Sequence, residues 1–141
     1  MCSFLAIHIS EINLVIFLAY RPPPHYTPDN LFHGRPLEQS FKNIILDNIS
    51  SVINDFGSPE PDFILMGDFN FPKVTWREGI GTPIHGDSPE TRMANSLIEV
   101  CDTHNLLQKI TFGTRPIQQG VENTLDRLFT NNHDLLCEIT K

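Results

Sequence analysis

The sequence predicts an α/β fold. Runs rich in β-branched and aromatic residues alternate along the chain with two segments whose apolar residues recur every three or four positions. The resulting order of strands and helices, with a hairpin at its start, favours helices and strands packed in layers. With 141 residues, of which 40% are hydrophobic and 19% charged, the chain has the size and composition of one globular domain.

A β-hairpin is predicted first. Residues 3–9 and 12–20 are two β-rich runs separated by Ser10-Glu11. The prolines at positions 22 to 24 are expected to end the second strand, since proline cannot continue a hydrogen-bonded ladder. Residues 24–36 are rich in proline, histidine, aspartate and asparagine, which is typical of a surface loop.

The clearest helix pattern follows this loop. Apolar residues from Leu37 to Phe56 recur mostly at spacings of three and four, which predicts an amphipathic helix of about five turns. Gly57 is expected to end this helix. Pro59 and Pro61 then lead into a buried strand over residues 62–66.

The second half of the chain is expected to contain one helix and two strands. Residues 71–87 are predicted to form a long loop. Ser88-Pro89-Glu90 has the pattern of a helix start, with an N-cap serine, a proline in the first turn and an acidic residue near the positive helix end. The helix is expected to close near Asn105, and strands are predicted over residues 124–130 and 135–140.

Composition argues against several classes of function. The net charge of −7 argues against general electrostatic binding of nucleic acid. It does not exclude a phosphate-cleaving site, because such a site often holds carboxylates whose charge a metal offsets. Three cysteines lie far apart, at Cys2, Cys101 and Cys137, which predicts reduced thiols in an intracellular protein. No apolar run reaches the roughly 18 residues of a membrane span, so no membrane partner is expected.

The most informative segment is the exit of the buried strand, Gly67-Asp68-Phe69-Asn70. If the chain stays extended there, Asp68 and Asn70 project from the same side. A carboxylate can orient a water or bind a cation, and an amide can donate to a phosphoryl oxygen, so the pair suits phosphate chemistry. The alternative is an ordinary turn after a strand, where both residue types are common.

Further motifs occur in one order along the chain: Tyr20-Arg21-Pro22-Pro23, Gly67-Asp68-Phe69-Asn70, Trp76, Thr114-Arg115 and Asn123-Thr124-Leu125-Asp126. Together with the long amphipathic helix, this set resembles the endonuclease/exonuclease/phosphatase family. More narrowly, it resembles the endonuclease domain at the start of non-LTR (LINE-type) retrotransposon polyproteins. The resemblance implies a four-layered α/β sandwich, with two β-sheets face to face and helices outside. It also implies one partial domain over residues 1–141, truncated at both ends relative to the family pattern.

The resemblance also implies an activity and its residues. The family hydrolyses phosphate esters with a divalent metal, usually Mg²⁺, and the retrotransposon subgroup nicks DNA to prime reverse transcription by a downstream reverse transcriptase domain. By this likeness, Asp68 would orient or deprotonate the attacking water. Asn70 would bind the scissile phosphate, and Tyr20 would approach it through its hydroxyl. Asp126 would act near the metal or align a catalytic histidine.

Two more residues are candidates for substrate binding by the same likeness. Thr114 matches a position close to the DNA, and Arg21 is a candidate phosphate contact. The metal ligands stay open, with Asp68 and Asp126 as the possible ones. Structural alternatives stay open as well: Tyr20 as an ordinary strand-end aromatic residue and Asp126 as a turn residue.

The sequence departs from the family pattern at functional positions. It has no match to the early asparagine and metal-binding glutamate, or to the Ser-Asp-His strand that carries the catalytic histidine, and His133 does not fit that motif. Arg127 replaces an apolar residue and is expected to face either solvent or a crowded interior. We therefore expect the isolated chain to be inactive, because losing members of a cooperative catalytic set is costly in rate.

Two other functions are compatible with the sequence. One is a phosphatase of the same superfamily that acts on a small phosphorylated substrate. The other is a non-catalytic fragment that pairs through open strand edges. A nuclear location follows only by analogy with the retrotransposon subgroup, since no basic localisation cluster is present.

Overall fold

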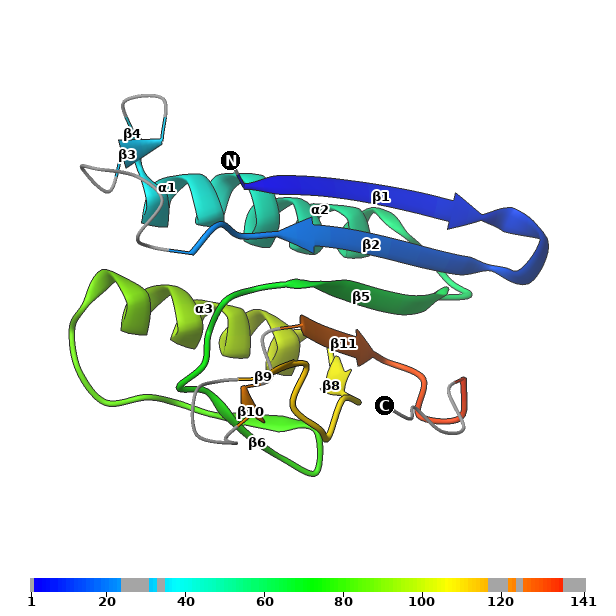
Figure 1. Cartoon of the computed structure of the whole chain (residues 1–141). Helices are drawn as coiled ribbons and strands as arrows, with labels where there is room; N and C mark the ends of the chain where they lie inside the picture. The colour runs from blue at the N-terminus through cyan, green and yellow to red at the C-terminus, as the bar shows by residue number, and fades with distance from the viewer. Residues whose placement is uncertain (1, 24–30, 33–34, 117–121, 124–125, 136–141) are drawn as a thin grey trace.

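A five-stranded sheet forms the centre of the protein in the computed structural model (Figure 1), which describes residues 2–23, 31–32, 35–116, 122–123 and 126–135. The strand order is β1-β2-β5-β11-β8. These strands are β1 (Ser3–Ile9), β2 (Leu14–Tyr20), β5 (Asp62–Asp68), β11 (Asp126–Thr130) and β8 (Leu107–Gln108). β2 and β5 run parallel, whereas the other neighbouring pairs are antiparallel.

The predicted hairpin at the start of the chain is confirmed. All seven residues of β1 pair with those of β2, from Ser3 opposite Tyr20 to Ile9 opposite Leu14. The connection is longer than expected, because Ser10–Ile12 forms a 3₁₀ turn and Asn13 adopts a left-handed conformation with φ of 49°. The second strand therefore begins at residue 14 and not at residue 12.

The predicted amphipathic helix forms in three consecutive parts. These are α1 (Leu37–Phe41), a π-helical turn (Lys42–Leu46) and α2 (Asp47–Asp55). The junction residues keep right-handed helical angles, so the stretch is continuous. It ends at Asp55, where Phe56 turns extended, two residues before Gly57.

The second helix, α3 (Pro89–Thr103), begins as the sequence predicts. The hydroxyl of Ser88 accepts a hydrogen bond from the backbone N–H of Thr91 at 3.1 Å, which is the N-cap arrangement. At the other end, Asn105 has a φ of 53° and turns the chain into β8. Figure 1 shows α3 and the α1–α2 stretch on the same side of the sheet.

The core lies between this helix layer and one face of the sheet. The sheet contributes Phe17, Phe63, Leu65 and Phe129 to the core, each exposed by 1% or less. On the helices, the largest buried side chains are those of Phe41, Ile45, Ile49 and Leu97. Since strand residues alternate between faces, the residues between those of the sheet point to its other side.

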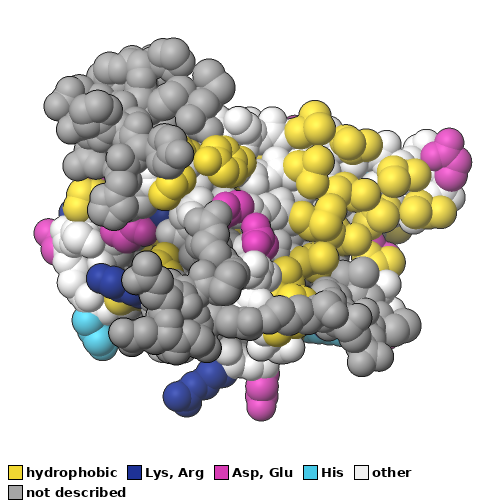
Figure 2. Space-filling model, in the orientation of Figure 1, with side chains coloured by type: hydrophobic (Ala, Val, Ile, Leu, Met, Phe, Trp, Pro, Cys, Tyr) yellow, Lys and Arg dark blue, Asp and Glu magenta, His cyan; other side chains and the backbone are white. Residues whose placement is uncertain are grey.

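The opposite face of the sheet is apolar and exposed over β1 and part of β2. On it, Leu5, Ile7 and Leu18 are 51%, 44% and 40% exposed. Figure 2, in the same orientation as Figure 1, shows hydrophobic side chains gathered over β1 and β2. The α/β prediction is thus confirmed, with a helix layer and one large sheet in the part of the chain that the structure describes.

The segment expected to be a long loop contains a second hairpin instead. β6 (Thr75–Arg77) pairs with β7 (Ile80–Thr82) around Glu78 and Gly79, which both have positive φ, at 51° and 83°. Paired residues with positive φ form the tight turns that match the twist of a hairpin. The prediction of an irregular 71–87 loop was therefore wrong in its centre.

Two further short strand pairs lie in the described part of the chain. β3 (Leu31–Phe32) pairs with β4 (Arg35–Pro36), and β9 (Arg115–Pro116) pairs with β10 (Glu122–Asn123). Of the strand predicted over residues 124–130, the part from Asp126 onward is confirmed. Residues 124–125 and 136–140 of the two predicted strands lie outside the described residues.

Candidate active site

Three of the predicted site residues lie side by side on adjacent strands. Tyr20 pairs with Asp68 across the parallel β2–β5 ladder, and Asp68 pairs with Asp126 across the antiparallel β5–β11 ladder. Directly paired residues project from the same face of a sheet. The phenol and the two carboxylates therefore form one row, on the sheet face that points away from the helices.

The row is accessible to solvent. Tyr20 is 42% exposed, Asp126 is exposed and Asp68 is half-buried between them. It lies at the carboxyl ends of β2 and β5, which coincide because these strands run parallel with Tyr20 opposite Asp68. The first residue of β11, Asp126, lies at the same level, because β11 runs antiparallel to β5.

Gly67 allows β2 and β5 to approach closely beside this row. A Cβ atom at Gly67 would lie 2.0 Å from the backbone oxygen of Ala19, its partner on β2. No side chain fits at that distance, so glycine is required one residue before Asp68. Gly67 thus has a packing role directly before Asp68.

The chain turns sharply after Asp68 and does not stay extended there. A carboxylate oxygen of Asp68 accepts a hydrogen bond from the backbone N–H of Asn70 at 3.1 Å, and Asn70 has a φ of 52°. This is an Asx turn, the alternative left open by the sequence. Asn70 is 6% exposed, and its amide nitrogen donates to the backbone oxygen of Arg21 at 2.6 Å.

Arg21 is enclosed beneath the turn. It is 0% exposed, and its guanidinium donates to the backbone oxygens of Phe69, at 2.6 Å, and Asn70. It also pairs with the carboxylate of Glu90 at 3.0 Å, and its Cζ lies 4.1 Å from the ring centroid of Phe71. The predicted contact between Arg21 and a substrate phosphate therefore has no support in this geometry.

Burial disfavours the charged form of Arg21. It lowers the pKa of the guanidinium, and the nearby Glu90 carboxylate opposes that shift. Sequence reasoning missed this role for Glu90, which was assigned only to the helix N-terminus. The sequence could not show this role, because the ion pair joins two segments that are distant along the chain, the end of β2 and the first turn of α3.

Thr114 lies next to the row. Its hydroxyl oxygen accepts a hydrogen bond from the backbone N–H of Asp126 at 3.2 Å. This contact ties the segment after β8 to the first residue of β11. The structure therefore brings Thr114 together with the predicted catalytic residues through the backbone of Asp126.

Arg127 follows Asp126 but points to the opposite face. It is 5% exposed, which settles the choice between solvent and interior in favour of the interior. Burial lowers the pKa of Arg127 to about 10, and the charge of Asp126 opposes that shift. This arginine is thus buried behind the row, not part of it.

Asp68 and Asp126 could hold a divalent cation. Mg²⁺ prefers oxygen ligands and is often bound by one or two carboxylates while it keeps several waters. Two carboxylates in register on neighbouring strands fit that requirement. Within the described ranges, no group of three or more histidine, cysteine, aspartate or glutamate residues is arranged to hold a metal.

Comparison with known families agrees with the motifs. A family model described as endonuclease-reverse transcriptase matches residues 14–140. The match covers most of the chain, so the chain belongs to the endonuclease-reverse transcriptase family, as its resemblance to retrotransposon endonucleases predicted. No curated protein matches the sequence. Among the described residues, no helix is long and apolar enough to cross a membrane.

Proposed function

We propose that this chain is part of a metal-dependent DNA endonuclease that belongs to a retrotransposon reverse transcriptase polyprotein and acts on DNA in the nucleus. The observation that carries the proposal is the row of Tyr20, Asp68 and Asp126 at one level of three adjacent strands. Membership of the endonuclease-reverse transcriptase family supports the same reaction class.

Each residue of the site has a role in phosphodiester hydrolysis. The Asx turn fixes the orientation of the Asp68 carboxylate, which would position the attacking water and accept its proton. The hydroxyl of Tyr20 would donate to a phosphoryl oxygen. Asn70 has a second amide hydrogen besides the one directed to Arg21, and it would donate to the same phosphate.

Asp68 and Asp126 would hold Mg²⁺. When bound, the cation supplies Lewis-acid polarisation of the phosphoryl oxygen. Thr114 would keep Asp126 in place through its hydrogen bond to the backbone of that residue. These groups would stabilise charge that develops as the bond breaks, which is usually the largest catalytic contribution.

We further propose that the isolated chain nicks DNA weakly or not at all. Its sequence has no match to the family's metal-binding glutamate or to the Ser-Asp-His strand. When catalytic groups act as a unit, the loss of one member removes most of the rate acceleration. The row would then be one part of a larger catalytic set.

The proposal can be tested first by metal binding, which does not require turnover. Mn²⁺ added to ¹⁵N-labelled protein should broaden the backbone amide signals of Tyr20, Asp68 and Asp126 before others, because paramagnetic broadening is local. Asp68→Asn should weaken this effect, whereas Asp47→Asn, which removes an exposed carboxylate from α2, should leave it unchanged. Broadening centred elsewhere would contradict the proposed cation site.

Nicking of supercoiled plasmid with Mg²⁺ tests the reaction. Any metal-dependent nicking should disappear in Asp68→Asn, and nicking that persists there would rule out this residue as the catalytic carboxylate. Release of inorganic phosphate from small phosphorylated molecules, without nicking, would instead identify a phosphatase.

A second candidate function is non-catalytic association through the sheet. β1 lies at one edge of the sheet that the described residues form, and its side chains Leu5 and Ile7 are about half exposed. Exposed apolar patches and free strand edges commonly mark surfaces for protein contacts. Concentration-dependent assembly, weakened by Leu5→Lys, would support this function, and a monomer at all concentrations would exclude it.

A further inference from the structure

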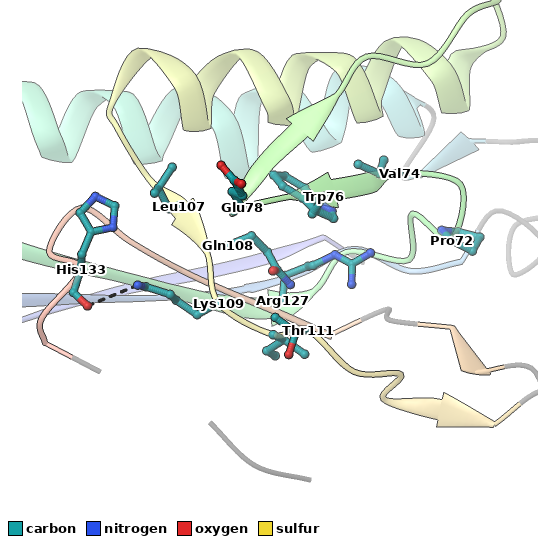
Figure 3. A pocket seen from close by; sticks show the side chains of 12 residues that line it. Pro72, Val74, Trp76, Glu78, Leu107, Gln108, Lys109, Thr111, Arg127 and His133 are labelled. Atoms are coloured by element: carbon teal, nitrogen blue, oxygen red, sulfur yellow. Dashed lines mark hydrogen bonds between the residues drawn. The ribbon is translucent and has the colours of Figure 1, made fainter. Parts of the chain in front are cut away.

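A pocket of about 490 Å³ lies beside β8 on the helix side of the sheet. Figure 3 shows its walls, which come from the β6–β7 hairpin, β8 with the residues after it, and β11. The pocket is separate from the candidate active site, because Arg127 lines it whereas its neighbour Asp126 projects from the opposite face.

Three buried hydrogen-bond donors line this pocket and have no partner. They are Nε1 of Trp76, Nε2 of Gln108 and Nη1 of Arg127. Only four buried side-chain atoms in the described part of the chain lack a hydrogen-bond partner, and three of these four belong to this pocket. Gln108 and Arg127 are each 5% exposed. Buried donors without acceptors are costly, and a charged one is the most costly.

The electrostatics of the pocket favour an anion. Arg127 brings a cationic guanidinium to the pocket, and no ion pair of the described residues involves it. Lys109 lies at the rim, where its ammonium donates to the backbone oxygen of His133 at 3.3 Å. The carboxylate of Glu78 also belongs to the lining, but Glu78 is exposed and solvated.

We propose that this pocket binds the phosphoryl group of a small organic phosphate through Trp76, Gln108 and Arg127. These donors come from three different strands, which suits a tetrahedral oxyanion with several acceptor oxygens better than a planar carboxylate. The remaining lining includes Val74 and Leu107, which offer an apolar surface to an organic substituent. A pocket of this volume has room for more than a phosphate ion.

The single tryptophan makes the site directly observable. In ¹⁵N NMR spectra, the one indole N–H signal belongs to Trp76. Titration with inorganic phosphate at constant ionic strength, with chloride as the balancing anion, should shift this signal in a saturable way. The side-chain amide signals of Gln108 should follow the same binding curve.

Variants separate specific binding from general charge. Arg127→Met should weaken phosphate binding by about tenfold or more, because it removes a charged hydrogen-bond donor. Arg77→Met removes the same charge from an exposed position on β6 outside the pocket and should leave binding unchanged. Equal weakening by both variants, or no effect of Arg127→Met, would overturn the proposal.

Gln108→Met gives a second test that preserves the shape of the buried side chain. It should also weaken phosphate binding by about tenfold, even if Arg127→Met fails to fold. Deoxythymidine monophosphate and deoxythymidine then distinguish the sources of the phosphoryl group. Saturable binding of inorganic phosphate, or of the nucleotide but not the nucleoside, supports the site. No binding of either phosphate at millimolar concentration, or equal binding of the nucleoside, overturns it.

Discussion

Asp126 lies directly opposite Asp68 across the antiparallel β5–β11 ladder, so two carboxylates project side by side from the sheet face that points away from the helices. Like charges at directly opposite positions of a sheet are destabilising. Hydrophobic or oppositely charged residues at these two positions would stabilise the sheet more. In the proposed function, a bound cation would neutralise this pair.

Removal of one charge should therefore stabilise the metal-free protein. Asp126→Asn is expected to raise the free energy of unfolding by about 0.2–1 kcal/mol in EDTA at low salt. It should also reduce the additional stability that Mg²⁺ provides by binding the folded state. Urea denaturation with and without Mg²⁺ measures both effects. Asp47→Asn on α2 is the control and should alter neither, and destabilisation by Asp126→Asn in EDTA would contradict the repulsion.

Gly67→Ala should disrupt the approach of β2 to β5. Its new Cβ atom would lie 2.0 Å from the backbone oxygen of Ala19, so the two strands must separate. Overpacking against a backbone atom is expected to cost about 3 kcal/mol in the free energy of unfolding. Thermal or urea unfolding checks this value, together with shifts in the amide signals of Tyr20 and Asp68.

Gly57→Ala is the matched control for that variant. A Cβ atom at Gly57 would have no atom within 4 Å, so a change within about 0.5 kcal/mol is expected. If Gly67→Ala were equally neutral, glycine would not be needed for the packing of β2 on β5.

Arg21 is expected to hold the Asp68–Asn70 turn in its conformation. Arg21→Met removes the donors to the backbone oxygens of Phe69 and Asn70 and leaves Glu90 without its ion-pair partner. We expect a loss of about 3 kcal/mol in the free energy of unfolding. Arg21→Lys should recover little, because an ammonium cannot reproduce the fork of the guanidinium.

A surface ion pair provides the comparison. Arg92→Met removes the contacts of an exposed arginine with Glu38 and Asp87 and should have a much smaller effect, since exposed pairs contribute little. Amide hydrogen exchange at Asn70 should accelerate in Arg21→Met but not in Arg92→Met. Unchanged exchange at Asn70 would show that the turn does not depend on Arg21.

The sequence predicted those features that depend on neighbouring residues. The N-cap at Ser88, the first hairpin and the strand that begins at Asp62 were all readable from local patterns, although that strand runs two residues beyond its predicted end. It did not predict the hairpin at Glu78-Gly79, because strands of three residues are too short to show an alternating pattern.

Long-range geometry was the part that could not be read. The alignment of Tyr20, Asp68 and Asp126 depends on the pairing of strands that are far apart in sequence. Burial of Arg21 was equally hidden, because arginine is rarely fully buried unless it finds partners that only the fold supplies. Residue type therefore identified the candidates, and the sheet register brought them together.

His104 should make stability fall in mild acid. Burial lowers its pKa below the ordinary value of 6.5, with Glu60 opposing the shift, and its Nε2 lies 3.1 Å from the hydroxyl oxygen of Ser50. Below pH 6.5 the unfolded state therefore binds more protons than the folded state, so stability is lost as the pH falls from 6.5 toward the folded pKa. Urea unfolding across this range should show a smaller loss for His104→Gln, which does not titrate, whereas His85→Gln, at an exposed position, should retain the full loss. An identical pH dependence in His104→Gln and the unchanged protein would mean that another group causes the loss.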